Sequence, residues 1–207
     1  MSRLKYKVYN GKSLKKVFEN SRLYLLIVMF VFGLTAGASV IKSESEITDK
    51  IILLFENYIS QKSGQGMLEN FCNSLTVNAL FFLINLLFAF SLIGIPFIIT
   101  LPMLKGFGLG CFCGYLYSTF RLTGLGYGIL MVYPGAIVSA MAFILACNDS
   151  CEYSRNAFLK SIKGKGQYEK DETRVYLTRQ LVFSGICAAS SAIDALTDAL
   201  FSGFFKI

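Results

Sequence analysis

Apolar residues in this chain occur in runs that are long enough to cross a lipid bilayer. From Leu75 to Cys147 the sequence runs for 73 residues with two charged side chains, Lys105 and Arg121. As a continuous helix such a run would measure about 110 Å, whereas the hydrocarbon core of a bilayer is about 30 Å thick. The run therefore predicts about three membrane crossings.

Turn signals and charged residues divide the apolar pattern into five predicted spans. Gly94-Ile95-Pro96 separates two of them, because glycine stops a helix and proline lacks the backbone N–H that a continuing helix needs. Lys105-Gly106 is an alternative turn, which would place the lysine at the cytoplasmic surface. The spans cover about residues 23–41, 75–92, 96–118, 124–147 and 181–204. They predict an all-α polytopic transmembrane bundle.

The positions of Lys and Arg predict the orientation of this bundle in the cell membrane. Residues 1–22 hold seven cations and one acid, residues 42–74 hold three and five, and residues 148–179 hold seven and five. Translocated short loops are poor in Lys and Arg. We therefore expect a basic cytoplasmic tail, a cytoplasmic 148–179 loop, an external 42–74 segment and an extracytoplasmic C-terminus. Residues 23–207 would form one integral membrane domain, and the net charge of +7 follows from topology, so no nucleic-acid partner is expected.

A cleavage site is an alternative interpretation of the first span. Ala36-Gly37-Ala38 follows a basic segment and an apolar core, as in a signal peptide. The apolar run continues to Ile41 and the leading segment is long, which favours an uncleaved span.

The external segment predicts an amphipathic helix, because its apolar residues recur at helical spacing. A helix that lies on the bilayer or caps the bundle would explain this stripe. A docking surface for an extracytoplasmic partner, built on Ile51, Phe55 and Tyr58, would explain it equally well. Both interpretations stay open.

Glycines at four-residue spacing predict close helix packing. They are Gly33 and Gly37 in the first span and Gly106, Gly110 and Gly114 in the third. Small residues let two helices approach closely, which is a main means of association in lipid. The fifth span carries its own small residues between Ser184 and Ala192. Packing within the monomer is favoured over an oligomer interface, although an oligomer is compatible with the pattern.

Charged residues inside the spans form a predicted pair. Lys105 lies in the third span, and Asp194 and Asp198 share one face of the fifth. Each charge at the centre of a span costs roughly 2.5 to 3.5 kcal/mol on insertion scales. Lys105 with Asp194 is the natural pairing. The pair could fix helix register or belong to a proton or ion path, and the lack of further carboxylates in spans two to four favours register.

The residue types present exclude much of membrane enzymology. The chain has no histidine, so His-ligated metals, Ser-His pairs and imidazole proton relays are excluded. Its six cysteines lack the grouping of a metal site or of a disulfide framework. Asp194 and Asp198 lie on one helix, whereas a paired-aspartate protease needs carboxylates that face each other across two. No catalytic, cofactor-binding or metal-ligating residue is predicted, and the protein is not expected to be an enzyme.

The order of these elements resembles the stage II sporulation protein M family over about residues 15 to 204. The resemblance rests on a basic tail, one span and an external amphipathic segment, followed by Gly94-Ile95-Pro96, Leu104-Lys105-Gly106, the glycine-spaced helix, and Ala188-Ala189-Ser190-Ser191 with Asp194. Many members carry Pro-His-Gly and a nearby Glu in the fourth span, whereas this chain has Pro134-Gly135-Ala136.

This resemblance implies a non-catalytic membrane anchor that acts in septal cell-wall remodelling during engulfment of the forespore. It would hold two wall-degrading partners, stage II sporulation proteins D and P, at the engulfing membrane. The alternative is a small channel or transporter subunit with Lys105 and Asp194 in its membrane pathway, suggested by Pro and Gly interruptions in adjacent spans.

Overall fold

The structure of the protein is a computed structural model that describes residues 2–43, 46–64, 66–91, 94–162 and 170–201. In these ranges every element is helical and no strand occurs, which confirms the predicted all-α class. In chain order the elements are α1 (Ser2–Lys42), α2 (Glu46–Gly64), α3 (Met67–Phe90), α4 (Gly94–Tyr127), the π-helix η1 (Gly128–Val132), α5 (Tyr133–Ile162) and α6 (Lys170–Phe201).

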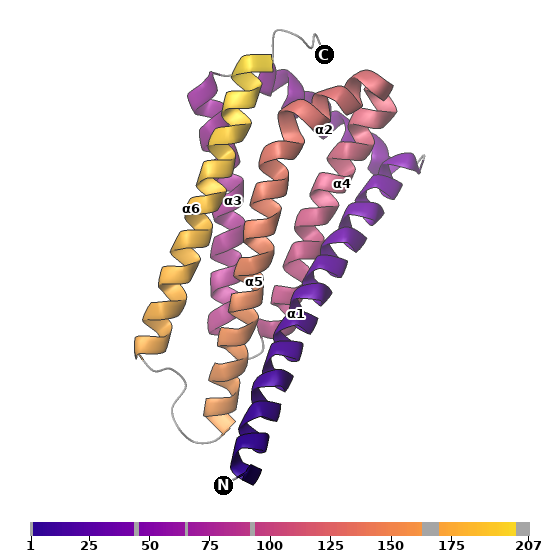
Figure 1. Cartoon of the computed structure of the whole chain (residues 1–207). Coiled ribbons are helices and arrows are strands. Elements are labelled where there is room, and N and C mark those ends of the chain that lie inside the picture. Colours follow the sequence, from indigo (N-terminus) through magenta and orange to yellow (C-terminus); the bar gives the residue numbers. More distant parts are fainter. Residues whose placement is uncertain (1, 44–45, 65, 92–93, 163–169, 202–207) are drawn as a thin grey trace.

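Five helices contain segments that are long and apolar enough to cross a membrane. The segments are Ser21–Lys42, Met67–Phe90, Gly94–Gly124, Tyr133–Lys160 and Asp171–Asp198. Their number confirms the predicted polytopic bundle, and the chain is a multi-pass membrane protein. Helix α1 begins at one end of the bundle and α6 ends at the other (Figure 1).

The helices extend beyond the apolar runs from which they were predicted. Helix α6 begins at Lys170, well before the apolar run that starts near Leu181. Charged residues interrupt the hydrophobic pattern there but not the helix, since Asp171 and Glu172 lie in its first turn, where the helix dipole favours acids. Much of the segment interpreted as a cytoplasmic loop is therefore helical.

The chain reverses direction between α3 and α4 at the predicted glycine. The N–H of Ser91 bonds to the carbonyl of Phe88 at 3.1 Å, and the N–H of Gly94 bonds to that of Ser91 at 3.2 Å. A Cβ atom on Gly94 would overlap the Phe88 carbonyl oxygen, so this close approach requires glycine. Lys105 lies inside α4, which excludes the alternative turn at Lys105-Gly106.

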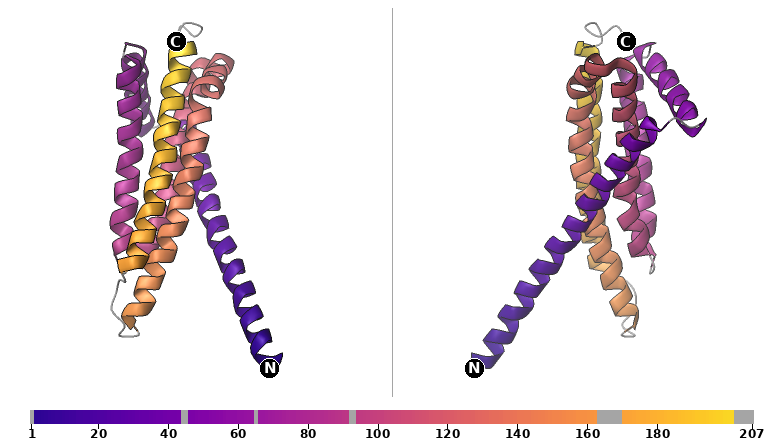
Figure 2. Two further views of the ribbon diagram at one scale, coloured as in Figure 1. Left: turned by 60° about the vertical axis from the view of Figure 1, so that its left-hand side comes forward. Right: turned by 90° about the vertical axis from the view of Figure 1, so that its right-hand side faces the viewer.

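Helices α3 to α6 run side by side and enclose the core, while α1 is inclined across α4 and α2 lies beside the end of the bundle where α6 ends (Figures 1 and 2). Phe143 is fully buried in this core. The rings of Phe81 and Phe82 meet the Phe143 ring edge-on. The distance between ring centroids is 5.6 Å in both pairs. The core therefore joins α3 to α5 at mid-height.

Helices α1 and α4 meet through glycine on both sides. A Cβ atom on Gly33 would overlap the backbone carbonyl of Met103 in α4, and one on Gly110 would overlap that of Leu34 in α1. The glycines along this contact are Gly33, Gly37, Gly106, Gly110 and Gly114. All five glycines selected from the sequence thus lie at one contact within the monomer, where the two backbones touch.

At its far end α4 leaves regular helical geometry. Arg121 has φ 48° and ψ −124°, in a region that strains a residue carrying a side chain. The π-helix η1 follows, and α5 begins at Tyr133, just before Pro134. The chain therefore turns from α4 into α5 over these residues (Figure 1).

We expect Gly110→Ala to destabilise the bundle by about 1 to 3 kcal/mol, the usual cost of overpacking, because the new Cβ would overlap the Leu34 backbone. Gly108→Ala is the matched control on the same helix. Position 108 has open space around an added Cβ, and alanine favours a helix by about 1 kcal/mol over glycine. Thermal unfolding in detergent measures both variants, and equal melting temperatures would show that the glycine contact carries no packing energy.

Candidate functional site

A cavity of about 360 Å³ lies among α2, α3, α4, α5 and α6. Its walls combine aromatic and aliphatic side chains with an unusual number of polar groups for a membrane-spanning region. The polar lining residues are Asn70, Asn73, Ser74, Asn78, Lys105, Ser139, Asp194 and Asp198. Intramembrane ionisable residues are costly and commonly mark functional sites, so this cavity is the candidate site of the protein.

Lys105 contributes a buried cation to the cavity. The residue is 9% exposed, and its Nζ donates to Asn78 Oδ1 at 3.0 Å and to the Ser139 carbonyl at 3.5 Å. The same Nζ lies 4.9 Å from the centre of the Phe143 ring, within cation–π range. Acceptors from α3 and α5, together with the ring, thereby replace the water that a lysine would have at the membrane surface.

Asp194 and Asp198 contribute carboxylates from α6. Ser74 Oγ on α3 donates to Asp194 Oδ2 at 3.2 Å. On its other side Asp194 lies against α5 at Gly135, where a Cβ atom would overlap the carboxylate. Asp198 follows one helical turn later and is buried, whereas Asp194 is half-buried. The absence of a side chain at Gly135 thus lets a carboxylate approach α5.

The charges are ordered along the axis of the bundle. Asn78, which binds Lys105, lies four residues from Ser74, which binds Asp194. Four residues of helix correspond to about 6 Å, and Asp198 lies about 6 Å further along α6. The cavity therefore has a positive level near Lys105 and a negative level toward the end of the bundle where α2 lies.

Lys105 and Asp194, the predicted pair, both line this cavity. Each member is hydrogen-bonded to α3, Lys105 to Asn78 and Asp194 to Ser74. Asn78 Nδ2 in turn donates to Ser191 Oγ on α6 at 3.1 Å. That the two charges act as one functional pair stays a prediction.

The α3 residues Asn78 and Asn85 were not selected from the sequence, although a signal for them exists. Ser74, Asn78 and Asn85 stand at spacings of four and seven in an otherwise apolar span, so they share one helix face. A polar stripe of this kind in a membrane span predicts hydrogen bonds to neighbouring helices. Both asparagines make such bonds here.

The amphipathic helix α2 lies with part of its apolar stripe against α4. The Phe55 ring meets Phe112 edge-on at 5.4 Å and stacks on Tyr115 at 5.6 Å. Tyr58 is 48% exposed, and both Phe55 and Tyr58 line the cavity. Ile51 is half-buried on the same helix. The structure thus packs α2 against α4, and partner docking by Ile51, Phe55 and Tyr58 stays a prediction.

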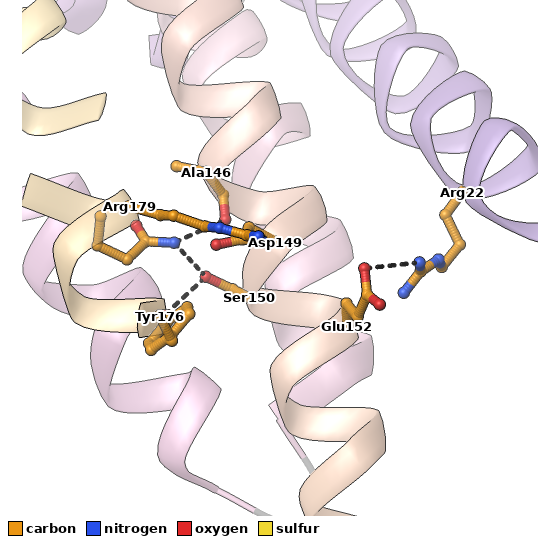
Figure 3. A network of polar contacts seen from close by, with 8 residues as sticks. Arg22, Ala146, Asp149, Ser150, Glu152, Tyr176 and Arg179 are labelled. Carbon is orange, nitrogen blue, oxygen red and sulfur yellow. Dashed lines mark hydrogen bonds and ion pairs between the residues drawn. The ribbon is translucent and has the colours of Figure 1, made fainter. Parts of the chain in front are cut away.

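A second polar network, centred on Ser150, joins α3, α5 and α6. Figure 3 shows its contacts between α5 and α6. Ser150 Oγ accepts hydrogen bonds from Asn85 Nδ2 at 2.8 Å and from Gln180 Nε2 at 3.2 Å. A hydroxyl oxygen has two acceptor positions and one hydrogen, so Ser150 donates to the Tyr176 hydroxyl at 2.9 Å. This buried serine is hydrogen-bonded to three side chains at once.

Ion pairs flank this network on α5. Arg179 Nη1 lies 3.0 Å from Asp149 Oδ1, and Arg22 of α1 lies 3.5 Å from Glu152 Oε2 (Figure 3). They connect α6 and α1 to the same helix. Sequence reasoning missed both pairs because it treated residues 148–179 as a loop, whereas α5 continues to Ile162.

The described ranges contain no cluster of side chains that could bind a metal ion. No group of three or more His, Cys, Asp or Glu side chains in those ranges could hold a metal ion. The six cysteines are free thiols, and Cys72 is the exposed member of the set.

The region that contains these sites matches a known protein family. A family model described as Stage II sporulation protein M matches residues 26–202, which is most of the chain. The chain belongs to the stage II sporulation protein M family. The match covers the glycine contact, the cavity and the Ser150 network, and membership implies a role in sporulation. Among curated proteins and among solved structures, none matches the chain.

We expect Ser150→Ala to destabilise this family member, because it would leave the buried amides of Asn85 and Gln180 without their shared acceptor. An unsatisfied buried donor costs about 1 to 3 kcal/mol. Ser118→Ala, at an exposed position on α4, is the control. Thermal unfolding in detergent should show a lower melting temperature for Ser150→Ala alone. No difference between the two variants would mean that the network adds nothing to stability.

Proposed function

We propose that the protein is a non-catalytic membrane scaffold that acts during forespore engulfment. The observation that carries this proposal is the placement of α2, an amphipathic helix fixed to one end of a multi-pass bundle by Phe55. On α2, Leu53 and Leu54 are 59% and 66% exposed and Tyr58 is also accessible. A fixed helix with exposed apolar side chains provides a docking surface. Membership of the stage II sporulation protein M family supports the cellular role.

The partners of this scaffold would be the peptidoglycan-degrading stage II sporulation proteins D and P. Their substrate lies outside the membrane, so α2 would have to face the extracytoplasmic side. The counts of Lys and Arg support that orientation, with seven cations and one acid in residues 1–22 against three and five in residues 42–74. The N-terminus would then be cytoplasmic and the C-terminus extracytoplasmic.

Replacing Ile51, Phe55 and Tyr58 together by serine should abolish co-purification of stage II sporulation proteins D and P from sporulating cells. The physical reason is the loss of both the apolar surface and the contact that fixes α2 on α4. The amount of protein in the membrane should stay normal, which immunoblotting of membranes measures. Leu200→Ser is the matched control, since Leu200 is 67% exposed near the same end of the bundle but belongs to α6. Normal recruitment and normal engulfment in the triple variant would disprove docking through α2.

A second candidate function is a small channel or transporter subunit. The cavity favours it, because Lys105, Asp194 and Asp198 line one polar space inside the bundle. Scaffold and conduit differ in what the charges do. In a scaffold they hold helices in register, whereas in a conduit they contact the transported species.

Single and double substitutions distinguish these two functions. Removing one partner of a buried pair can cost roughly 3 to 5 kcal/mol, whereas apolar replacement of both can be nearly neutral. For a scaffold, Lys105→Met or Asp194→Leu should therefore impair engulfment, and the double variant should regain much of it. A conduit should stay inactive in all three variants. Engulfment counted by microscopy, at matched membrane levels, gives the result, and an inactive but stable double variant would contradict the scaffold.

A further inference from the structure

The cavity combines opposite charges at two levels with space between them. Lys105 lies at one level, beside Asn78. From the helical rise of about 1.5 Å per residue, Asp194 lies about 6 Å and Asp198 about 12 Å nearer to the α2 end of the bundle. The cavity that they line has a volume of about 360 Å³. An electrically complementary ligand would therefore carry an anionic group toward Lys105 and a cationic group toward the aspartates.

Hydrogen bonding restricts the chemistry of the two ends further. Lysine is a common ligand of phosphate, which it binds as a point charge. Carboxylates accept hydrogen bonds, so a primary ammonium with three N–H donors suits Asp194 and Asp198 better than a quaternary one. Asn70 and Asn73, which also line this end of the cavity, add further polar contacts.

Access to the cavity lies along the seam between α3 and α4. Val77 of α3 and Leu104 of α4 line the cavity and are each 56% exposed, and Gly108 is an exposed position between them and the α2 end. Exposed apolar side chains on membrane-crossing helices face lipid. A ligand with acyl chains could thus place its polar group in the cavity and keep its chains in the bilayer.

The geometry points to a binding site for a phosphoethanolamine-type zwitterion, with its phosphate at Lys105 and its ammonium at Asp194 and Asp198. The apolar seam favours the lipid-borne form, an aminophospholipid head group, over the free zwitterion. This assignment does not depend on the scaffold role, because it rests on the charges of Lys105, Asp194 and Asp198 and not on a partner of α2.

Native mass spectrometry of the full chain, released from detergent micelles that contain equal amounts of three lipids, tests the site. The lipids are phosphatidylethanolamine, phosphatidylcholine and phosphatidylglycerol. We expect phosphatidylethanolamine adducts to exceed the other two by about tenfold, since one charge-assisted hydrogen bond corresponds to roughly that factor. Equal adducts of the three lipids would overturn the assignment.

Two glycine variants test the place of binding without touching a charged group. Gly108→Leu should fill the mouth of the cavity and remove the preference for phosphatidylethanolamine. Gly185→Leu on α6 is the matched control, because both positions are exposed and have nothing within 4 Å of an added Cβ. Both variants should therefore fold. A preference that survives Gly108→Leu, or that Gly185→Leu removes as well, would place binding elsewhere and overturn the proposal.

A charge variant and a soluble competitor test the chemistry and the source of the ligand. Asp194→Asn should reduce phosphatidylethanolamine adducts about tenfold, whereas Asp49→Asn, at an exposed position on α2, should leave them unchanged. Loss of phosphatidylethanolamine adducts on addition of free phosphoethanolamine would show that the site binds the zwitterion without its acyl chains. Resistance to this competitor, with the preference and the Gly108→Leu effect intact, would identify the lipid-borne form. Insensitivity of the preference to Asp194→Asn would overturn the assignment.

Discussion

The backbone contact between α1 and α4 is the constraint on which the rest of the structure depends. Lipid provides little hydrophobic force between helices, so close packing has to hold them together. Glycines 106, 110 and 114 remove the side chains from one face of α4, and α1 occupies that face. Lys105 and Phe112 lie on another face of the same helix and line the cavity. Because an α-helix is rigid, fixing the glycine face against α1 also fixes the direction in which Lys105 points.

Helix α3 supplies hydrogen bonds to both Lys105 and Asp194. Its single polar stripe of Ser74, Asn78 and Asn85 reaches α4, α5 and α6. In hydrocarbon a polar group without a partner is costly, so such a stripe can only be accommodated when several helices surround it. The stripe also borders two different environments along the bundle. Near Ser150 the partners close into a compact network, whereas near Asn78 they border open space.

The hydrophobic pattern predicted the class, because crossing a bilayer imposes strong length and polarity limits. Together with turn signals and charged residues it also predicted the number of spans, and glycine and proline predicted the turn at Gly94. Glycine spacing selected the residues of the α1–α4 contact. It could not predict which helix packs on α4, because the fifth span is also rich in small residues. Which faces meet is decided by tertiary packing. The extent of α6 was missed for another reason. The apolar run begins only near Leu181, because the residues before it are mostly polar. The helix itself already begins at Lys170.

The position of α2 links the cavity to the surface proposed for docking. Phe55 and Tyr58 line the cavity from one side, and the same helix exposes Leu53 and Leu54. A molecule in the cavity and a partner on α2 would therefore contact one common element. If occupation of the cavity changes how α2 rests on Phe112, linkage requires that binding of the partner changes the affinity of the cavity by the same factor. A scaffold built in this way would sense the composition of its membrane through the helix that it presents to its partners.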